Sequence, residues 1–163
     1  MYRVAIITLS DKGARGERED VSGQVIEEMV QKEGYAVVSR QLLSDDRQGL
    51  TDALVKICDE NAADLILTTG GTGFSPRDNT PEATSDACER MVPGIAEAMR
   101  AASMKLTNRA MLSRAVSGIR KKTLIVNLPG SPKAVRENLG FILPTLAHGI
   151  AILVGDDGEC ARV

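Results

Sequence analysis

The chain has 163 residues, with 20 lysines and arginines against 22 aspartates and glutamates. This length suits one domain with a sizeable core, and the formal net charge of −2 argues against a protein that coats nucleic acid. The chain has two tyrosines, two phenylalanines and no tryptophan, which leaves little material for stacking bases. We therefore expect a single domain over residues 1–163 that binds no nucleic acid.

The apolar segments and the cysteines favour a cytoplasmic protein. The apolar segment at residues 3–9 is too short for a secretory signal, and the run at residues 141–154 is too short to span a bilayer. The three cysteines, Cys58, Cys88 and Cys160, form no C-x-x-C pair, so the sequence indicates neither a zinc site nor a disulfide framework. We expect a protein of the reducing cytoplasm without a membrane partner.

Taken in chain order, the hydrophobic pattern alternates strands with helices. It predicts a strand at residues 3–9, a polar loop at 10–20, a helix at 21–33, a strand at 36–43, a helix at 48–61 and a strand at 64–69. A helix begins at Pro81 with Thr80 as its cap, and a further helix at 94–105 and strands at 113–119 and 123–128 follow. Residues 129–132 break the chain, and the remainder up to 154 is helical with an interruption near Pro144. The strands are apolar without alternation, as expected where helices cover both faces of a sheet. The fold class is therefore α/β with a mainly parallel sheet, and ligands should bind beyond the carboxyl ends of its strands.

A glycine-rich segment, TTGGTG at residues 68–73, follows the third predicted strand. Its glycines let a ligand approach the backbone closely and can turn amides toward an anion. The segment is no P-loop, and it is no G-x-G-x-x-G motif because Pro76 stands where the last glycine would be. A plain turn is the alternative. Arg77 and Asp78 follow directly and favour a phosphate cradle, with one charge for a phosphate and one for a metal ion.

Two other predicted strands end in loops that carry hydroxyl and carboxylate groups. Ser10 and Asp11 are placed to meet a ligand, whereas Asp20 is interpreted as a helix cap. Asp45 and Asp46 follow the second strand, and either one is equally well a turn or cap residue. A carboxylate from this pair that converges on the glycine-rich loop would complete a site for magnesium and phosphate.

The positive charge is concentrated in one segment. Residues 98–136 contain no acid, and they include the loop at residues 129–132, for which a turn and a ligand contact stay open as alternatives. One interpretation is a surface whose charges even out on folding, and the other is a basic wall that faces an anionic ligand. The bases of this segment are Arg100, Lys105, Arg109, Arg114, Arg120, Lys121, Lys122, Lys133 and Arg136.

The segment TTGGTGFSPRDNTPEAT at residues 68–84 is the most specific of four segments that resemble a known family. That family is the molybdopterin adenylyltransferases, which include MogA- and MoaB-type proteins and the G domains of gephyrin and of the plant Cnx protein. Ser44 replaces the proline that usually precedes the first acidic position, which leaves the choice between Asp45 and Asp46 open. The other matching segments are the loop with Ser10, Asp11, Gly16, Asp20, Ser22 and Gly23, the AMLSR and GIR segments at residues 110–114 and 118–120, and LIVNLPGSPKAV at residues 124–135.

The resemblance implies a three-layer α/β/α sandwich, the molybdopterin-binding fold, assembled as a homotrimer or a hexamer. It implies a role in molybdenum cofactor biosynthesis, in which ATP and Mg²⁺ convert molybdopterin into adenylyl-molybdopterin and pyrophosphate. The acids expected to act in catalysis and to hold Mg²⁺ are Asp45 and Asp78. The residues expected to contact substrate or phosphate are Ser10, Asp11, Thr69, Gly70, Gly71, Thr72, Gly73, Ser113, Pro129, Gly130 and Ser131.

Some features of this function stay open at this point. A metal-insertion protein is expected to act downstream, and the sequence does not separate a molybdenum from a tungsten pathway. The alternative from another functional class is a non-catalytic molybdopterin-binding or scaffold module of the same fold. The presence of both acids favours the enzyme.

Overall fold

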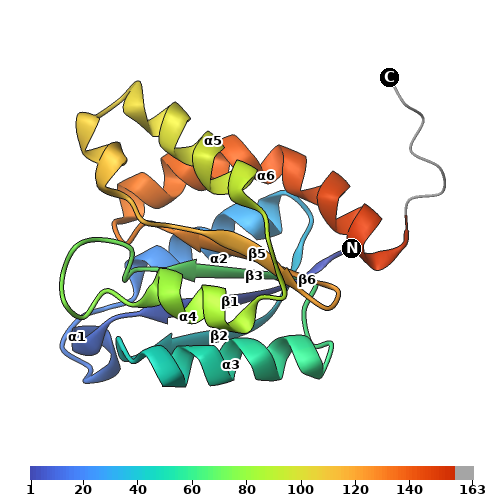
Figure 1. Ribbon diagram of the computed structural model, residues 1–163, viewed down its shortest axis with the longest axis horizontal. Coiled ribbons are helices and arrows are strands. Elements are labelled where there is room, and N and C mark those ends of the chain that lie inside the picture. Colours follow the sequence, from blue (N-terminus) through green and yellow to red (C-terminus); the bar gives the residue numbers. More distant parts are fainter. Residues whose placement is uncertain (157–163) are drawn as a thin grey trace.

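The protein forms one sheet in the computed structural model, which describes residues 1–156, with strands in the order β2-β1-β3-β6-β5-β4 (Figure 1). The first four strands of that order run parallel to one another, and these are β2 (Ala36–Leu43), β1 (Arg3–Leu9), β3 (Leu65–Thr69) and β6 (Thr123–Leu128). The next strand, β5 (Ser117–Arg120), pairs antiparallel with both β6 and the edge strand β4 (Arg90–Met91). The prediction of a mainly parallel sheet is confirmed.

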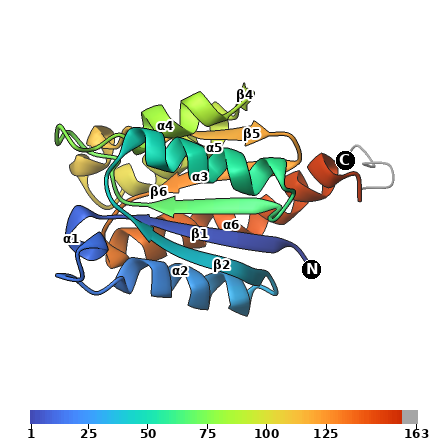
Figure 2. The same cartoon turned by 90° about the horizontal axis from the view of Figure 1, so that it is seen from below.

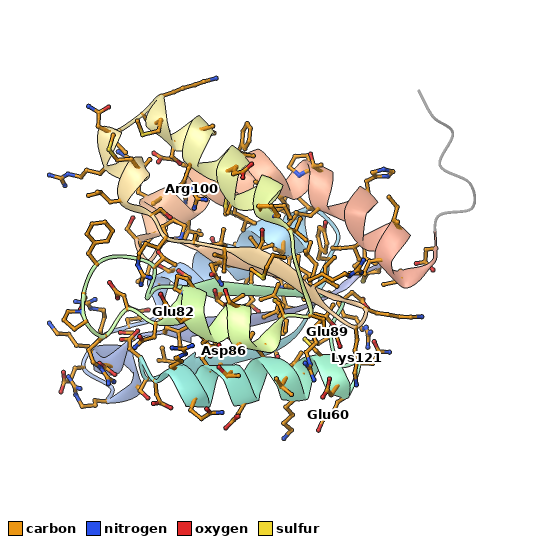
Figure 3. The ribbon with its side chains drawn as sticks, in the orientation of Figure 1. Glu60, Glu82, Asp86, Glu89, Arg100 and Lys121 are labelled. Carbon is orange, nitrogen blue, oxygen red and sulfur yellow. The ribbon has the colours of Figure 1, made fainter. Side chains whose placement is uncertain are left out.

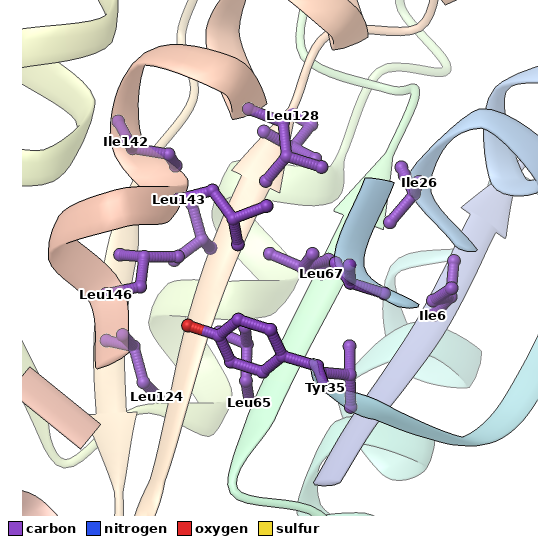
Figure 4. Packing of buried hydrophobic residues seen from close by; sticks show 14 of the residues in the cluster. Ile6, Ile26, Tyr35, Leu65, Leu67, Leu124, Leu128, Ile142, Leu143 and Leu146 are labelled. Atoms are coloured by element: carbon purple, nitrogen blue, oxygen red, sulfur yellow. The ribbon is translucent and has the colours of Figure 1, made fainter. Parts of the chain in front are cut away.

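Helices cover both faces of the sheet, which gives the expected three layers (Figure 2). One face packs against α2 (Val21–Lys32), α5 (Pro93–Met104) and α6 (Pro132–Val154), and the other packs against α3 (Arg47–Asp59) and α4 (Thr80–Ala87). Successive side chains of a strand point to opposite faces, so Ile6 enters the first core and Ile7 the second. Figure 4 shows the first core, where Leu143 and Leu146 of α6 lie against the sheet near Leu67.

The observed elements differ from the predicted ones at several boundaries. The loop at residues 10–20 contains a short helix, α1 (Asp11–Ala14). The strand expected at residues 113–119 begins only at β5, because the 3-10 helix η1 (Asn108–Leu112) and a short connection precede it. β2 alternates between more and less buried residues, since it is an edge strand covered on one face. The prediction that the strands do not alternate between buried and exposed residues is wrong for β2.

Helix α6 passes through Pro144 without interruption, contrary to the prediction. A proline removes one helical hydrogen bond, here the bond to the carbonyl of Gly140. Both residues are exposed, so water can satisfy that carbonyl. The helix therefore continues because its proline faces away from the core.

The continuous α6 is long and apolar enough to cross a membrane by length and composition alone, which the predicted shorter run was not. In this fold Val135, Leu139, Leu143 and Leu146 of α6 are buried in the first core. A core helix of the same composition passes the same test, so the apolar stripe is explained by packing.

Candidate active site

The carboxyl ends of β1, β2, β3 and β6 meet around a cavity of about 570 Å³. Their four following loops all contribute to its wall, as the topology of a parallel sheet predicts. The predicted site residues that line this cavity are Ser10, Asp45, Thr69, Gly70, Gly71, Asp78, Gly130 and Ser131.

The glycine-rich loop has a conformation that only glycine adopts easily. Gly70 has a φ of +93°, and a Cβ there would lie 2.4 Å from the carbonyl oxygen of Leu9. Gly71 has a φ of +69°, and its Cβ would lie 2.2 Å from Oγ1 of Thr80. That hydroxyl donates to the carbonyl of Gly70 at 2.8 Å. The protein's own packing therefore already requires glycine at both positions, whatever ligand approaches the loop.

Asp45 and Asp78 flank this loop from different elements. Oδ1 of Asp45 lies 3.5 Å from the position of a Cβ on Gly71, and Oδ2 of Asp78 lies 2.9 Å from that of a Cβ on Gly73. Oδ2 of Asp78 also accepts the amide of Ser75 at 2.9 Å, which orients the carboxylate within the loop. The fold thus brings together two carboxylates that are far apart in the sequence.

The structure separates the roles of the two adjacent acids at the end of β2. Asp46 is the N-cap of α3, where its Oδ2 accepts the amide of Gly49 at 2.6 Å. Asp45 lies in the cavity wall, and its Oδ2 accepts the amide of Asp11 at 3.0 Å. The amide of Asp45 in turn donates to Oδ1 of Asp11 at 3.0 Å. Asp45 is therefore the acid that reaches the candidate site.

The electrostatic environment differs sharply between these acids. Burial raises the pKa of Asp45, and the negative charges of Asp11 and Asp78 raise it further against the opposing hydrogen bond from the Asp11 amide. Asp11 itself does not line the cavity, because Arg77 holds both of its carboxylate oxygens at 2.9 and 3.0 Å. This guanidinium lowers the pKa of Asp11 to about 2. Asp45 and Asp78 thus both line the cavity, and the positive charge of Arg77 offsets the rise in the pKa of Asp45 only in part.

Several hydroxyls and acids of the site also have structural tasks. Asp20 caps α2 through the amide of Gly23 at 2.8 Å, as predicted, and it lines the cavity as well. Ser131 caps α6 through the amide of Ala134 at 3.2 Å. The amino end of this long helix is therefore at the cavity, where its amides and dipole favour an anion.

The prediction that Thr80 caps α4 is wrong. Asn79 occupies the N-cap position without a side-chain cap bond, and Thr80 is the first helical residue. Its buried hydroxyl instead holds the glycine-rich loop through the carbonyl of Gly70. No motif in the sequence signals this role, because it depends on how α4 packs under the loop.

A second cavity, of about 290 Å³, lies on the other side of the glycine-rich loop. The fold thus divides the predicted contacts between two cavities separated by one loop. Arg100 and Arg109 from the base-rich segment also line the second cavity. The predicted site residues found there are Thr72, Gly73, Ser113 and Pro129.

The base-rich segment forms no continuous wall around the site. Arg120 and Lys121 both pair with Asp59 at the opposite, amino-terminal end of the sheet. Figure 3 shows Lys121 at that end, far from Arg100. The idea of a basic wall therefore holds only for the part of the segment that lies near the glycine-rich loop.

The comparisons with known proteins agree with this geometry. The family model described as "Probable molybdopterin binding domain" matches residues 5–148. The chain belongs to this family. The molybdopterin adenylyltransferase of Helicobacter pylori J99 is 40% identical over 94% of this chain and 88% of its own, and that of Escherichia coli K12 is 37% identical over 91% and 79%.

Solved structures of similar proteins have the same fold. The molybdopterin biosynthesis enzyme MoaB of Thermus thermophilus is 46% identical, covers 95% of this chain and 98% of its own, and superposes with a TM-score of 0.89. The tungsten cofactor synthesizing protein MoaB of Pyrococcus furiosus is 34% identical with a TM-score of 0.85, covering 94% of this chain and 97% of its own. The molybdopterin-binding fold expected from the resemblance is therefore confirmed.

The site offers few ligands for a metal ion. Within residues 1–156, no three histidine, cysteine, aspartate or glutamate side chains are grouped so that they could hold a metal by themselves. Asp45 and Asp78 are two carboxylates, which fits Mg²⁺, since proteins bind this ion through one or two carboxylates together with substrate phosphates and water. Burial first, and the charges of Asp11 and Asp78 after it, raise the pKa of Asp45, and a bound cation would favour its charged form.

Proposed function

We propose that this protein is a molybdopterin adenylyltransferase of molybdenum cofactor biosynthesis. In the proposed reaction, a phosphate oxygen of molybdopterin attacks the α-phosphorus of ATP, and the bond from that phosphorus to pyrophosphate breaks. The products are adenylyl-molybdopterin and pyrophosphate. Support comes from family membership and from relatives that carry this name over most of their length.

One observation carries the proposal: two carboxylates from separate loops flank the glycine-rich loop in one cavity. Both substrates are anionic, so their approach requires positive charge or aligned dipoles at the point of transfer. The amino end of α6 and the amides of the loop provide such dipoles. Asp45 and Asp78 would hold Mg²⁺, which supplies charge neutralisation at the transferred phosphate when it is bound.

The two cavities suit a reaction with two substrates. They lie on either side of the glycine-rich loop, which lines both of them. We place the triphosphate at the larger cavity, because both acids line it. The transferred phosphate then lies beside Gly70 and Gly71, where the backbone can approach it closely.

A molybdopterin-binding or scaffold module would need no pair of acids at the loop. The converging carboxylates therefore favour the enzyme over this alternative. The two functions differ in one cheap measurement, because only the enzyme consumes ATP, and it does so only when molybdopterin is present. ATP turnover without molybdopterin would instead point to a different nucleotide-dependent enzyme.

The decisive experiment is pyrophosphate release from ATP with molybdopterin and Mg²⁺, measured for the wild type and for Asp78→Asn. Asparagine keeps the size and one acceptor oxygen but removes the charge, so we expect a folded variant that turns over about 10²-fold more slowly or worse. The matched control is Asp46→Asn, since asparagine caps helices as well as aspartate does. Wild-type turnover in a folded Asp78→Asn protein would remove this acid from the catalytic machinery.

The assembly and surroundings of the enzyme belong to the same proposal. We infer a cytoplasmic homotrimer, with a hexamer as the alternative, acting before a metal-insertion protein. Exposed apolar side chains at Leu106, Met111 and Phe141 offer area that an assembly could bury. Light scattering that shows a monomer of 17.4 kDa at every concentration would contradict the trimer.

A further inference from the structure

Arg114 makes a set of contacts that no motif assigns to it. The segment from Gly73 to Asp78 leaves the glycine-rich loop and returns to α4, carrying Asp78 at its end. The guanidinium of Arg114 donates to the carbonyl of Gly73 at 2.8 Å through Nε and to the carbonyl of Asp78 at 2.7 Å through Nη2. One side chain thus holds both ends of this segment, which we call the Asp78 loop.

We propose that Arg114, held in place by Glu82, is a positioning residue that sets the location of Asp78. This inference rests on the proposed function for its kinetic consequence, but its structural part stands on the contacts alone. The backbone of Arg114 strengthens the arrangement, because its amide donates to the carbonyl of Thr72 at 3.0 Å. The main chain and the side chain of Arg114 therefore both fasten the loop.

Glu82, on α4, contacts the guanidinium of Arg114. Its Oε1 accepts from Nη1 of Arg114. Burial would raise the pKa of Glu82, but the hydrogen bond and charge of Arg114, together with a backbone hydrogen bond and the charge of Arg47, outweigh burial and hold the pKa below its usual value. Oε2 of Glu82 has no hydrogen-bond partner among residues 1–156, so this carboxylate is directed at Arg114 through Oε1. Glu82 thus fixes the guanidinium that fastens the Asp78 loop.

The outer side of the Asp78 loop is held less firmly. Arg77 reaches across to Asp11, but more than half of the Arg77 side chain is exposed. Ion pairs in such positions contribute little, because water and salt screen them. The three side-chain bonds of Arg114 lie at the half-buried inner side of the loop, where each bond is stronger. Arg114 is therefore the main anchor.

Lysine cannot replace arginine in this position. A guanidinium directs several N–H groups along fixed, diverging directions, whereas an ammonium is a compact point charge. Arg114→Lys keeps the positive charge but cannot reach two carbonyls and a carboxylate together. This variant separates positioning from simple attraction of anionic substrates, which lysine would preserve.

The chain contains a matched control in Arg120. Its guanidinium also donates to a carboxylate, that of Asp59, and to a backbone carbonyl, that of Ala87, at the far end of the sheet. Arg120→Gln and Arg120→Lys remove equivalent bonds away from the site. Any effect shared by the Arg114 and Arg120 variants reflects general loss of stability.

The experiment combines hydrogen exchange with steady-state kinetics on the full chain. In Arg114→Gln and Arg114→Lys, we expect amides of residues 73–79 to exchange at least about 10-fold faster, since local opening governs exchange. We expect kcat to fall about 10²-fold, the scale of a small misplacement of a reacting group. KM for molybdopterin should stay within about threefold, because Asp78 is placed at the triphosphate, whereas KM for ATP should rise because Asp78 helps to hold its Mg²⁺. Glu82→Gln should show the same pattern more weakly, and both Arg120 variants should show neither change.

Each result decides the proposal. Unchanged exchange at residues 73–79 in Arg114→Gln overturns it, and so does restored turnover in Arg114→Lys. Slow turnover with normal exchange means that Arg114 contacts substrate directly, which also overturns positioning. If Arg114→Gln fails to fold, Glu82→Gln carries the test with the same readouts. The two proposals can also fail separately. If the Arg114 variants exchange faster but the wild type releases no pyrophosphate, the positioning role is supported and the proposed function is contradicted.

Discussion

The acidic side chains at the two ends of the sheet differ in their surroundings. At the amino ends, Asp64 accepts from the amide and guanidinium of Arg3, and Asp59 is shared by Arg120 and Lys121. At the carboxyl ends, Asp45 lies between other carboxylates and has a raised pKa. Each of these acids at the amino ends has a basic partner, whereas at the carboxyl ends Arg77 pairs with Asp11 and leaves Asp45 buried beside other carboxylates.

The same contrast holds for the backbone. Gly34, in the turn between α2 and β2, has a φ of +83° with open space around it. Gly71, at the opposite end, has a φ of +69° and is also packed against Thr80. The carboxyl end thus combines a rare conformation with tight packing, as expected where a backbone is shaped for a ligand.

The largest effect on stability should come from placing a methyl group at Gly71. In Gly71→Ala both the left-handed conformation and the contact with Oγ1 of Thr80 oppose the new atom, so we expect the free energy of unfolding to fall by about 3 kcal/mol. Gly34→Ala faces only the conformational strain, about 1 kcal/mol. Denaturant unfolding of both variants measures the difference, and equal losses would show that Thr80 moves aside freely.

The second largest effect should come from removing the paired charge of Asp64 at the amino end. Asp64 is largely buried and accepts from the backbone and side chain of Arg3, so Asp64→Asn leaves part of this network unpaired. We expect a loss of about 2 kcal/mol in the free energy of unfolding, with normal kcat in the folded protein. A fall in kcat at saturating substrate would contradict the separation between the two ends.

At the carboxyl end, removing an acid should raise the free energy of unfolding instead of lowering it. Asp45→Asn removes one of the clustered negative charges while keeping an oxygen for the amide of Asp11, so the ligand-free protein should gain about 0.5 kcal/mol at pH 7. Pyrophosphate release should nevertheless be lost. Because the pKa of Asp45 is raised on folding, the gain should disappear as the pH falls through that pKa. A variant less stable than the wild type at pH 7 would argue against stored repulsion.

The smallest effect concerns Asp59 at the amino end. Arg120 and Lys121 lower the pKa of Asp59 to about 2, so its contribution to stability is present above the usual aspartate pKa and is lost as the pH falls toward 2. The stability advantage of the wild type over Asp59→Asn should therefore vanish over that interval. Thermal unfolding at several pH values tests this, and an advantage that persists at pH 2 would be inconsistent with it.

Local sequence patterns are sufficient to predict the layers and most of the loops of this protein. Apolar runs and glycine or proline breaks define local structure, and they predict β1, β2 and β6 with their observed bounds. Because parallel strands end at one edge, the same pattern also places Asp78, the glycine-rich loop and one acid of the Asp45–Asp46 pair together.

The roles of neighbouring polar residues such as Asp45 and Asp46 follow from the tertiary structure. Asp45 and Asp46 are neighbouring residues of the same type. Only the direction in which α3 leaves the sheet makes Asp46 a helix cap and Asp45 part of the cavity wall. The roles of Thr80 and Arg114 depend on carbonyls that lie 10 and 36 to 41 residues away along the chain. Such contacts follow no local period, because they are set by how separate elements pack, and a linear pattern carries no record of them.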